Sequence, residues 1–163
     1  MSAEHEYAFR LFWEGNLGEG TASYQGYGRQ WRAQAAGKPD LVGTADLAFR
    51  GDRDLHNPED LLIVSLSSCH MLTYLALCAR NGISVLSYAD DASGVMKTTP
   101  DGGGRFESVT LRPKVVIAGE GKKALAMDLH EKAHSLCFIA SSVNFPVHHA
   151  AVVSESTDSS GSH

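Results

Sequence analysis

The sequence predicts a single α+β domain over residues 1–155, with a disordered tail at residues 156–163. Residues 61–79 contain no charged side chain, which is typical of a buried helix. Several other segments alternate apolar and polar residues, which is typical of strands. The resulting order is three strands, a helix, two strands, a helix and a strand. In a chain of 163 residues, this order fits one α+β domain with a sizeable core.

The segment before the long helix is predicted to form three strands. The first is predicted from alternating apolar residues, namely Tyr7, Phe9, Leu11 and Trp13. The second covers residues 24–35 and ends at a turn-forming run at residues 37–39. The third covers residues 44–50, and a polar loop leads from there into the long helix.

The long helix is predicted to run from Asn57 to Gly82. Asn57 suits the N-cap, and Pro58 suits the first turn, where its missing N–H would be unsatisfied anyway. Gly82 suits a left-handed stop. The uncharged run reaches transmembrane length, but its polar residues favour a buried helix instead. These residues are Ser65, Ser67, Ser68, His70 and Thr73.

A helix that is apolar on nearly every side must be covered on every side. One small set of strands cannot cover it alone, whereas a second copy of the chain can. We therefore expect a homodimer with intertwined helices.

Two strands are predicted directly after the long helix. Residues 83–98 form the first, with a kink near residues 90–94. A glycine-rich turn at residues 100–104 follows. Alternation over residues 109–117 then predicts a half-exposed strand, in which Pro113 indicates an edge position or a bulge.

A second helix and a final strand complete the prediction. Apolar residues at helical spacing predict the helix at residues 122–136. Residues 138–143 continue or restart it, and Pro146 ends any such continuation. Residues 147–154 form the last predicted strand.

Composition excludes several classes of protein. The formal net charge is -5 and there is no basic run, which disfavours nucleic-acid binding. The 3 cysteines do not form the even framework of a small secreted protein, so we expect a cytoplasmic location. The N-terminal residues do not resemble a signal peptide.

Cys69, in the middle of the long helix, is the first candidate for chemistry. A buried cysteine usually acts as a small hydrophobic residue and stays protonated at neutral pH. A reactive Cys69 would need a neighbouring cation to hold its thiolate. The candidate cations are Arg50, Arg53 and Arg29, and Glu59 could orient such an arginine through a bidentate pair. Both interpretations of Cys69 are open at this point.

Cys137 is the second candidate, because it follows the apolar face of the second helix. If the two helices pack together, Cys69 and Cys137 could reach disulfide distance. Two unrelated core cysteines are the alternative. Cys78 faces another side of the long helix than Cys69 and is predicted to be a core residue.

A metal site fits less well. His134 and Cys137 have the spacing of metal ligands, and Cys69 with His70 could supply two more. However, adjacent helical residues diverge by about 100°, so Cys69 and His70 cannot easily face one ion. We therefore expect no metal.

The other histidines carry no assigned chemistry. His70 is predicted to be a polar residue at the helix surface, and His148 and His149 are predicted to be exposed strand residues. A serine hydrolase is disfavoured, because no aspartate that could orient His70 is identifiable.

The segment HNPEDLLIVSLSSCHM resembles the long helix of the OsmC/Ohr family, which contains osmotically inducible protein C and organic hydroperoxide resistance proteins. The shared residues are the start at Asn57, Pro58 and Glu59, then Leu61 and Cys69. Cys137 is placed like the second cysteine of the family, on a later helix. The resemblance covers about residues 7–155.

This resemblance implies antiparallel sheets wrapped around long central helices in an intertwined homodimer. It also implies a cysteine-based peroxidase that reduces organic hydroperoxides without a metal or bound cofactor, in an oxidative stress response. Cys69 would be the peroxidatic cysteine, Cys137 the resolving cysteine and Glu59 the orienting carboxylate. Arg50 is our first choice for the arginine that holds the thiolate, and Arg29 is the second. An external dithiol would reduce the Cys69–Cys137 disulfide.

The chain departs from the family pattern at two places. Phe138 follows Cys137 where many members have proline, and the loop before Asn57 is one residue longer than expected. We expect an apolar substrate pocket with walls from Met71, Phe138 and Phe145. A non-enzymatic redox sensor or small-ligand carrier on the same fold is the alternative function.

Overall fold

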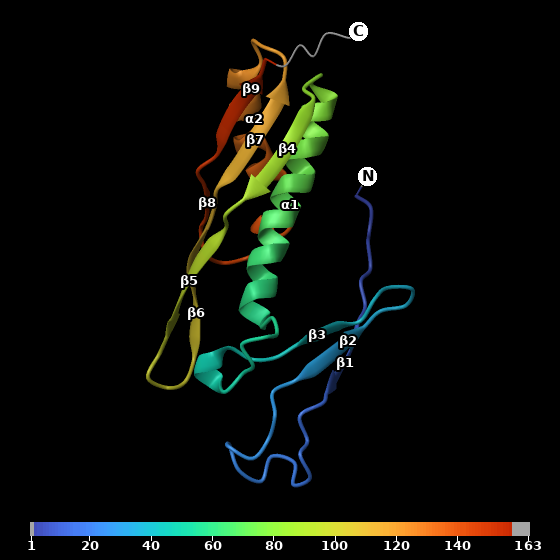
Figure 1. Ribbon diagram of the computed structural model, residues 1–163, viewed down its shortest axis with the longest axis vertical. Helices are drawn as coiled ribbons and strands as arrows, with labels where there is room; N and C mark the ends of the chain where they lie inside the picture. Colours follow the sequence, from blue (N-terminus) through green and yellow to red (C-terminus); the bar gives the residue numbers. More distant parts are fainter. Residues whose placement is uncertain (1, 158–163) are drawn as a thin grey trace. The chain divides into compact units, whose positions relative to one another are not determined.

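The structure, a computed structural model, describes residues 2–157 (Figure 1). The chain divides into two compact units, Met1–Leu62 and Ile63–His163. From residue 158 onward, the predicted tail lies outside the described residues. The elements are β1 (Arg10–Trp13), β2 (Trp31–Gln34), β3 (Leu41–Gly43), η1 (Leu47–Phe49), α1 (Pro58–Arg80), β4 (Val85–Asp90), β5 (Ser93–Thr98), β6 (Gly104–Leu111), β7 (Pro113–Ala118), α2 (Lys123–Leu136), η2 (Ala140–Ser142), β8 (Val147–His149) and β9 (Val152–Ser156).

The first unit is built on the antiparallel sheet β1-β2-β3. Two tryptophans of these strands form hydrogen bonds to backbone carbonyls of the neighbouring loops. Trp13 donates its indole N–H to the carbonyl of Gly28 at 2.8 Å, and Trp31 donates to the carbonyl of Thr44 at 3.0 Å. The two predicted strands at residues 7–13 and 24–35 are confirmed in their existence, but both are shorter than expected.

The strand predicted at residues 44–50 does not form, and Asp46 explains why. β3 ends at Gly43, and residues 47–49 form the short 3-10 helix η1. The Asp46 side chain accepts a hydrogen bond from the N–H of Ala48 at 2.7 Å, and its carbonyl accepts from the N–H of Phe49 at 2.9 Å. This local bonding turns the chain and competes with an extended strand.

Both ends of α1 are fixed by the residues that predict them. At the start, Asn57 Oδ1 accepts from the N–H of Asp60 at 2.8 Å, and Asp60 Oδ2 accepts in return from the N–H of Asn57 at 3.3 Å. At the end, Gly82 has a positive φ of 67°, and the N–H of Ile83 reaches back to the carbonyl of Cys78 at 2.9 Å. This is a Schellman stop, which glycine adopts without steric cost.

Only one face of α1 is buried in the described chain, whereas the sequence predicts burial on nearly every side. The buried residues recur at helical spacing, namely Leu66, His70, Tyr74, Leu77 and Cys78. Val64 and Leu72 are 58% and 62% exposed. α1 is also the one helix among residues 2–157 that is long and apolar enough to cross a membrane. A core helix meets the same criterion, and the packed face of α1 is that of a core helix.

The second unit holds two mixed sheets of three strands (Figure 1). In β4-β7-β9, the central strand β7 is antiparallel to β4 and parallel to β9. In β5-β6-β8, the central strand β6 is antiparallel to β5 and parallel to β8. The predicted strands at 83–98 and 147–154 are each divided between the two sheets, as β4 with β5 and as β8 with β9. The architecture is α+β, as predicted.

The edge position predicted for Pro113 is wrong. Pro113 is the buried first residue of β7, and β7 is the middle strand of its sheet. A proline is tolerated there because its missing N–H falls at the start of the ladder. The predicted single strand at 109–117 is therefore the end of β6 and most of β7, with Arg112 between them.

The core of the second unit joins α1, α2 and the sheet β4-β7-β9. Tyr74 is its largest fully buried side chain, and its hydroxyl donates to the carbonyl of Ala126 on α2 at 3.0 Å. This bond pairs a buried polar group between the two helices. The remaining buried members of the cluster are Leu77, Cys78, Ile83, Val115, Ile117, Ala126, Leu129, Ala133 and Val153.

Candidate thiol site

The structure places Cys69 and Cys137 on separate elements of the second unit. Cys69 lies in the middle of α1 and is partly exposed. Cys137 directly follows α2, which ends there because Cys137 takes an extended conformation with φ -68° and ψ 116°. Its side chain is 1% exposed. All of the cysteines are free thiols.

The two side chains are in hydrogen-bond contact. Burial raises the pKa of Cys137 to about 11, and its hydrogen bond with Cys69 raises this pKa as well. The N–H of Ala140 donates to Cys137 Sγ at 3.5 Å. Cys137 therefore keeps its proton at neutral pH.

A groove begins one helical turn beyond Cys69. Thr73 donates its hydroxyl to the carbonyl of Cys69 at 2.9 Å and lies at the near end of the groove. The cavity volume is about 290 Å³, and the α2 end contributes Leu136 and Phe138. Phe138 is 81% exposed. The cysteine pair is thus bordered by an open and mainly apolar surface.

The segment that holds both thiols matches a known protein family. The OsmC-like protein family matches residues 51–150, which include both cysteines and α1 from Pro58 onward. The chain belongs to the OsmC-like family.

Several relatives of this OsmC-like chain are similar in sequence or in fold. The uncharacterized protein YmaD of Bacillus subtilis is 28% identical over 90 residues, which are 53% of this chain and 59% of YmaD. An OsmC-like protein of unknown function from Vibrio cholerae has 27% identity and a TM-score of 0.81, with 91% of this chain and 100% of that chain covered.

A structure described as an organic hydroperoxide resistance protein shares the fold at lower identity. OhrB of Bacillus subtilis is 16% identical with a TM-score of 0.59, over 91% of this chain and 98% of that chain. This likeness establishes the common OsmC-like fold, to which proteins named for hydroperoxide resistance also belong.

The predicted carboxylate and the predicted arginines of the site lie in the first unit of the OsmC-like chain. Glu59 occupies the first turn of α1. Arg50 is exposed and follows η1 with a positive φ of 65°. The guanidinium of Arg29 lies over the rings of Tyr24 and Tyr27, at 4.5 and 3.7 Å from their centroids. It also donates to the carbonyls of both tyrosines. The pairing of Glu59 or either arginine with Cys69 stays a prediction.

The three residues predicted to form one substrate pocket do not share a cavity. Phe138 lines the groove beside the thiols, whereas Met71 lines a different cavity next to α1. Phe145 packs against Phe106 with a centroid distance of 5.5 Å. Met71 is two residues from Cys69, so it points about 200° around the helix from it. The helical period alone predicts that Met71 and Cys69 lie on opposite sides of α1.

The predictions for His70 and His149 are wrong. His70 is 1% exposed, and its Nε2 lies 3.0 Å from Nδ1 of the equally buried His130 on α2. His149 is only partly exposed and pairs with Glu131 at 3.0 Å. The signal for His70 was available in the sequence, because it lies four residues from both Leu66 and Tyr74 on the buried face.

Burial governs the protonation of this histidine pair. Burial lowers the pKa of His70 to about 4, with further lowering by His149 and His134. Burial also lowers the pKa of His130 to about 3, with further lowering by His70 and His149. Both imidazoles are therefore neutral at physiological pH. Among residues 2–157, no group of three or more His, Cys, Asp or Glu side chains is arranged to hold a metal ion.

Proposed function

We propose that this protein is a thiol-dependent peroxidase that reduces organic hydroperoxides to alcohols. The observation that supports it most directly is the hydrogen bond between Cys69 and Cys137, two thiols that are 68 positions apart in sequence. A pair in such contact can form a disulfide with little movement of the backbone. The partly exposed member, Cys69, is the one that a substrate can reach.

In the proposed reaction, the thiolate of Cys69 attacks the terminal oxygen of the hydroperoxide. The O–O bond breaks, the alkoxide takes a proton and leaves as an alcohol, and Cys69 becomes a sulfenic acid. The sulfur of Cys137 then attacks the sulfur of Cys69. The S–O bond breaks, the proton of Cys137 leaves with the hydroxide as water, and the Cys69–Cys137 disulfide forms. An external dithiol reduces this disulfide by exchange and is itself oxidised.

The proposal assigns Cys137 as the resolving residue for a physical reason. Its buried thiol, whose pKa is raised to about 11, is a poor first nucleophile. It lies next to Cys69 and loses its proton only when the sulfenic acid provides a leaving group. A cation must stabilise the thiolate of Cys69, and we assign this role to Arg50, with Arg29 as the second choice and Glu59 as the orienting carboxylate.

The setting of the reaction follows from the same proposal. The groove beside the thiols has an apolar wall from Leu136 and Phe138, which suits an organic substrate better than hydrogen peroxide. We also propose that the protein is a cytoplasmic homodimer, because the exposed apolar residues on the outer face of α1 need a cover.

Replacing the nucleophile tests this function. With tert-butyl hydroperoxide and a dithiol such as dihydrolipoamide, the wild type should turn over. Cys69→Ser should retain only the uncatalysed background rate, because an alcohol cannot take the place of the thiolate. Cys78→Ala is the matched control, since it removes the other thiol of α1 and should keep the wild-type rate.

Counting free thiols distinguishes an enzyme from a sensor or carrier. One equivalent of hydroperoxide should remove two thiols per chain within the time of one turnover, and the dithiol should restore them. Full peroxide turnover by Cys69→Ser would refute the proposal. Oxidation of Cys69 without cycling would favour a redox sensor instead.

A further inference from the structure

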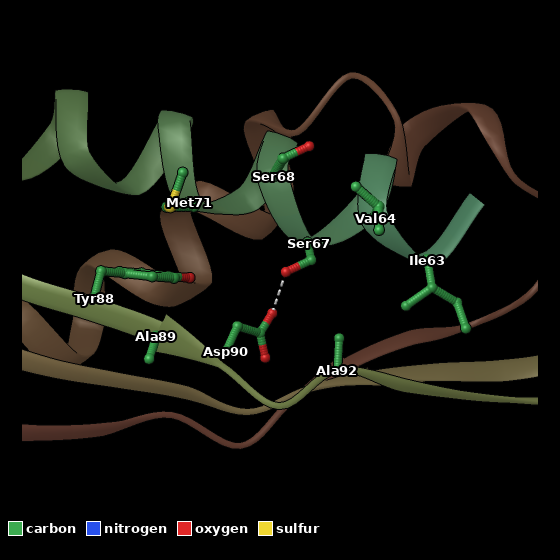
Figure 2. A pocket seen from close by; sticks show the side chains of 9 residues that line it. All are labelled: Ile63, Val64, Ser67, Ser68, Met71, Tyr88, Ala89, Asp90 and Ala92. Atoms are coloured by element: carbon green, nitrogen blue, oxygen red, sulfur yellow. Dashed lines mark hydrogen bonds between the residues drawn. The ribbon is translucent and has the colours of Figure 1, made fainter. Parts of the chain in front are cut away.

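A second cavity lies on another side of α1 from the thiols. Its volume is about 350 Å³, and it lies between α1 and the segment from β4 to β5 in the second unit (Figure 2). Ser67 and Met71, which line it, are each two residues from Cys69 and so point about 160° to 200° around the helix from it. Any ligand of this cavity is therefore separate from the proposed peroxide chemistry.

A carboxylate without a cationic partner lies at the polar end of the cavity. Asp90 Oδ2 accepts from the hydroxyl of Ser67 at 2.6 Å (Figure 2). Asp90 Oδ1 accepts from the backbone N–H of Arg112 at 2.6 Å. Within residues 2–157, no lysine, arginine or histidine forms an ion pair with Asp90. The neighbouring Asp91, by contrast, is paired with Lys114 at 2.6 Å. Two neutral donors thus hold a partly buried negative charge, which leaves room for a cation.

The hydroxyl of Tyr88 is the second unsatisfied group of this cavity. It is buried and has no hydrogen-bond partner among the described residues. Figure 2 shows its ring along the cavity, with the hydroxyl directed toward Ser67 and Asp90. Burial raises the pKa of Tyr88, and the charge of Asp90 raises this pKa further, so the group remains a neutral phenol. A buried hydroxyl without a partner costs free energy that a suitable ligand would recover.

We propose that this cavity binds a small primary ammonium ion that carries an apolar substituent. An –NH₃⁺ group has three donors and no acceptor, and the oxygens of Ser67, Tyr88 and Asp90 all can accept. Asp90 supplies the opposite charge, which makes these hydrogen bonds charge-assisted. Ile63, Val64 and Met71 provide apolar walls for the substituent. The volume lies near the lower end of the range for small-molecule sites.

The charge requirement is tested with a matched pair of ligands. Isothermal titration of the full chain at pH 7 should show saturable binding of 2-phenylethylamine, with one site per chain. The neutral 2-phenylethanol has the same shape without the charge, and it should bind at least about tenfold more weakly. Cys69→Ser should bind the amine like the wild type, so failure of the peroxidase proposal would leave this result unaffected.

A pair of neighbouring aspartates provides the matched variants. Asp90→Asn should weaken amine binding at least about tenfold, because the amide lacks the charge. Asp91→Asn removes the same charge from the adjacent exposed residue and should change the affinity by less than about threefold.

Replacing the phenol gives a second test that does not depend on Asp90. Tyr88→Phe should leave the free protein at least as stable as the wild type, because it removes an unpartnered buried hydroxyl. It should still weaken amine binding severalfold. The proposal is overturned by equal binding of the amine and the alcohol, by wild-type affinity in Asp90→Asn, or by an absence of saturable amine binding. The last result would be obtained if a side chain of a second copy filled the cavity.

Discussion

Cys69 and His70 are neighbours on α1, yet each has a partner from the α2 region and a different physical environment. Cys69 contacts Cys137, next to an open groove. His70 is enclosed with His130, whose ring also stacks on Tyr74 at a centroid distance of 3.8 Å. The step of about 100° between neighbouring helical residues sends one side chain to an accessible edge and the other into the core. The comparison shows that the cysteine pair, which we propose to be reactive, differs from the histidine pair in solvent access rather than in separation along the chain.

The largest expected effect concerns the thiol pair. Cys137→Ser should still be oxidised at Cys69 but should form no intramolecular disulfide. Turnover with a dithiol should fall at least about a hundredfold, because capture of the sulfenic acid is no longer intramolecular. Mass spectrometry after one equivalent of hydroperoxide should show the gain of one oxygen, where the wild type loses two hydrogens. Rapid formation of a Cys69–Cys78 disulfide in this variant would contradict the assignment of Cys137 as the resolving residue.

An intermediate effect is expected from the histidine pair, and it concerns stability. His130→Ala should lower the free energy of unfolding by about 3 kcal/mol, because it opens a cavity against Tyr74 and leaves the buried His70 without its partner. Urea denaturation measures this change. His148→Ala, at an exposed position on β8, is the control and should alter stability by less than about 0.5 kcal/mol. If both variants behaved alike, the pair would have no structural role.

The last expected effect is the pH dependence of stability. In the folded chain the pKa values of His70 and His130 are about 4 and about 3, below the ordinary value of 6.5. The unfolded chain therefore binds more protons below that value, and stability falls as the pH falls from about 6.5 toward 4. Above about pH 7 this contribution should be constant. Urea midpoints between about pH 7 and 5 measure the loss, and a constant midpoint in the wild type would contradict the buried neutral pair.

Local chemistry was sufficient for some predictions. The ends of α1 were predictable from Asn57, Pro58 and Gly82. The N-cap, the first turn and the left-handed stop each depend on residues only a few positions apart in the sequence. The helix at residues 122–136 was predictable from its apolar spacing and was off by one residue at its start. The η1 segment was missed because one side chain, Asp46, decides between an extended and a turned backbone.

Long-range pairing limited the other predictions. Pro113 suggested an edge strand, but its position in β7 depends on which strands lie on either side, namely β4 and β9. The pocket predicted from Met71, Phe138 and Phe145 combined side chains that the fold sends to separate places. Apolar character can be read from composition, whereas a shared cavity requires the positions of several elements at once.

The sequence by itself determined the α+β class, the ends of α1 and the choice of Cys69 and Cys137 as candidates. These features depend on periodicity, capping and spacing along the chain. Only the tertiary structure decided that the two thiols touch, that His70 is enclosed, and that Tyr88 and Asp90 share a second cavity. The physical reason is that such contacts join residues far apart in sequence, and their formation depends on how the helices and sheets pack.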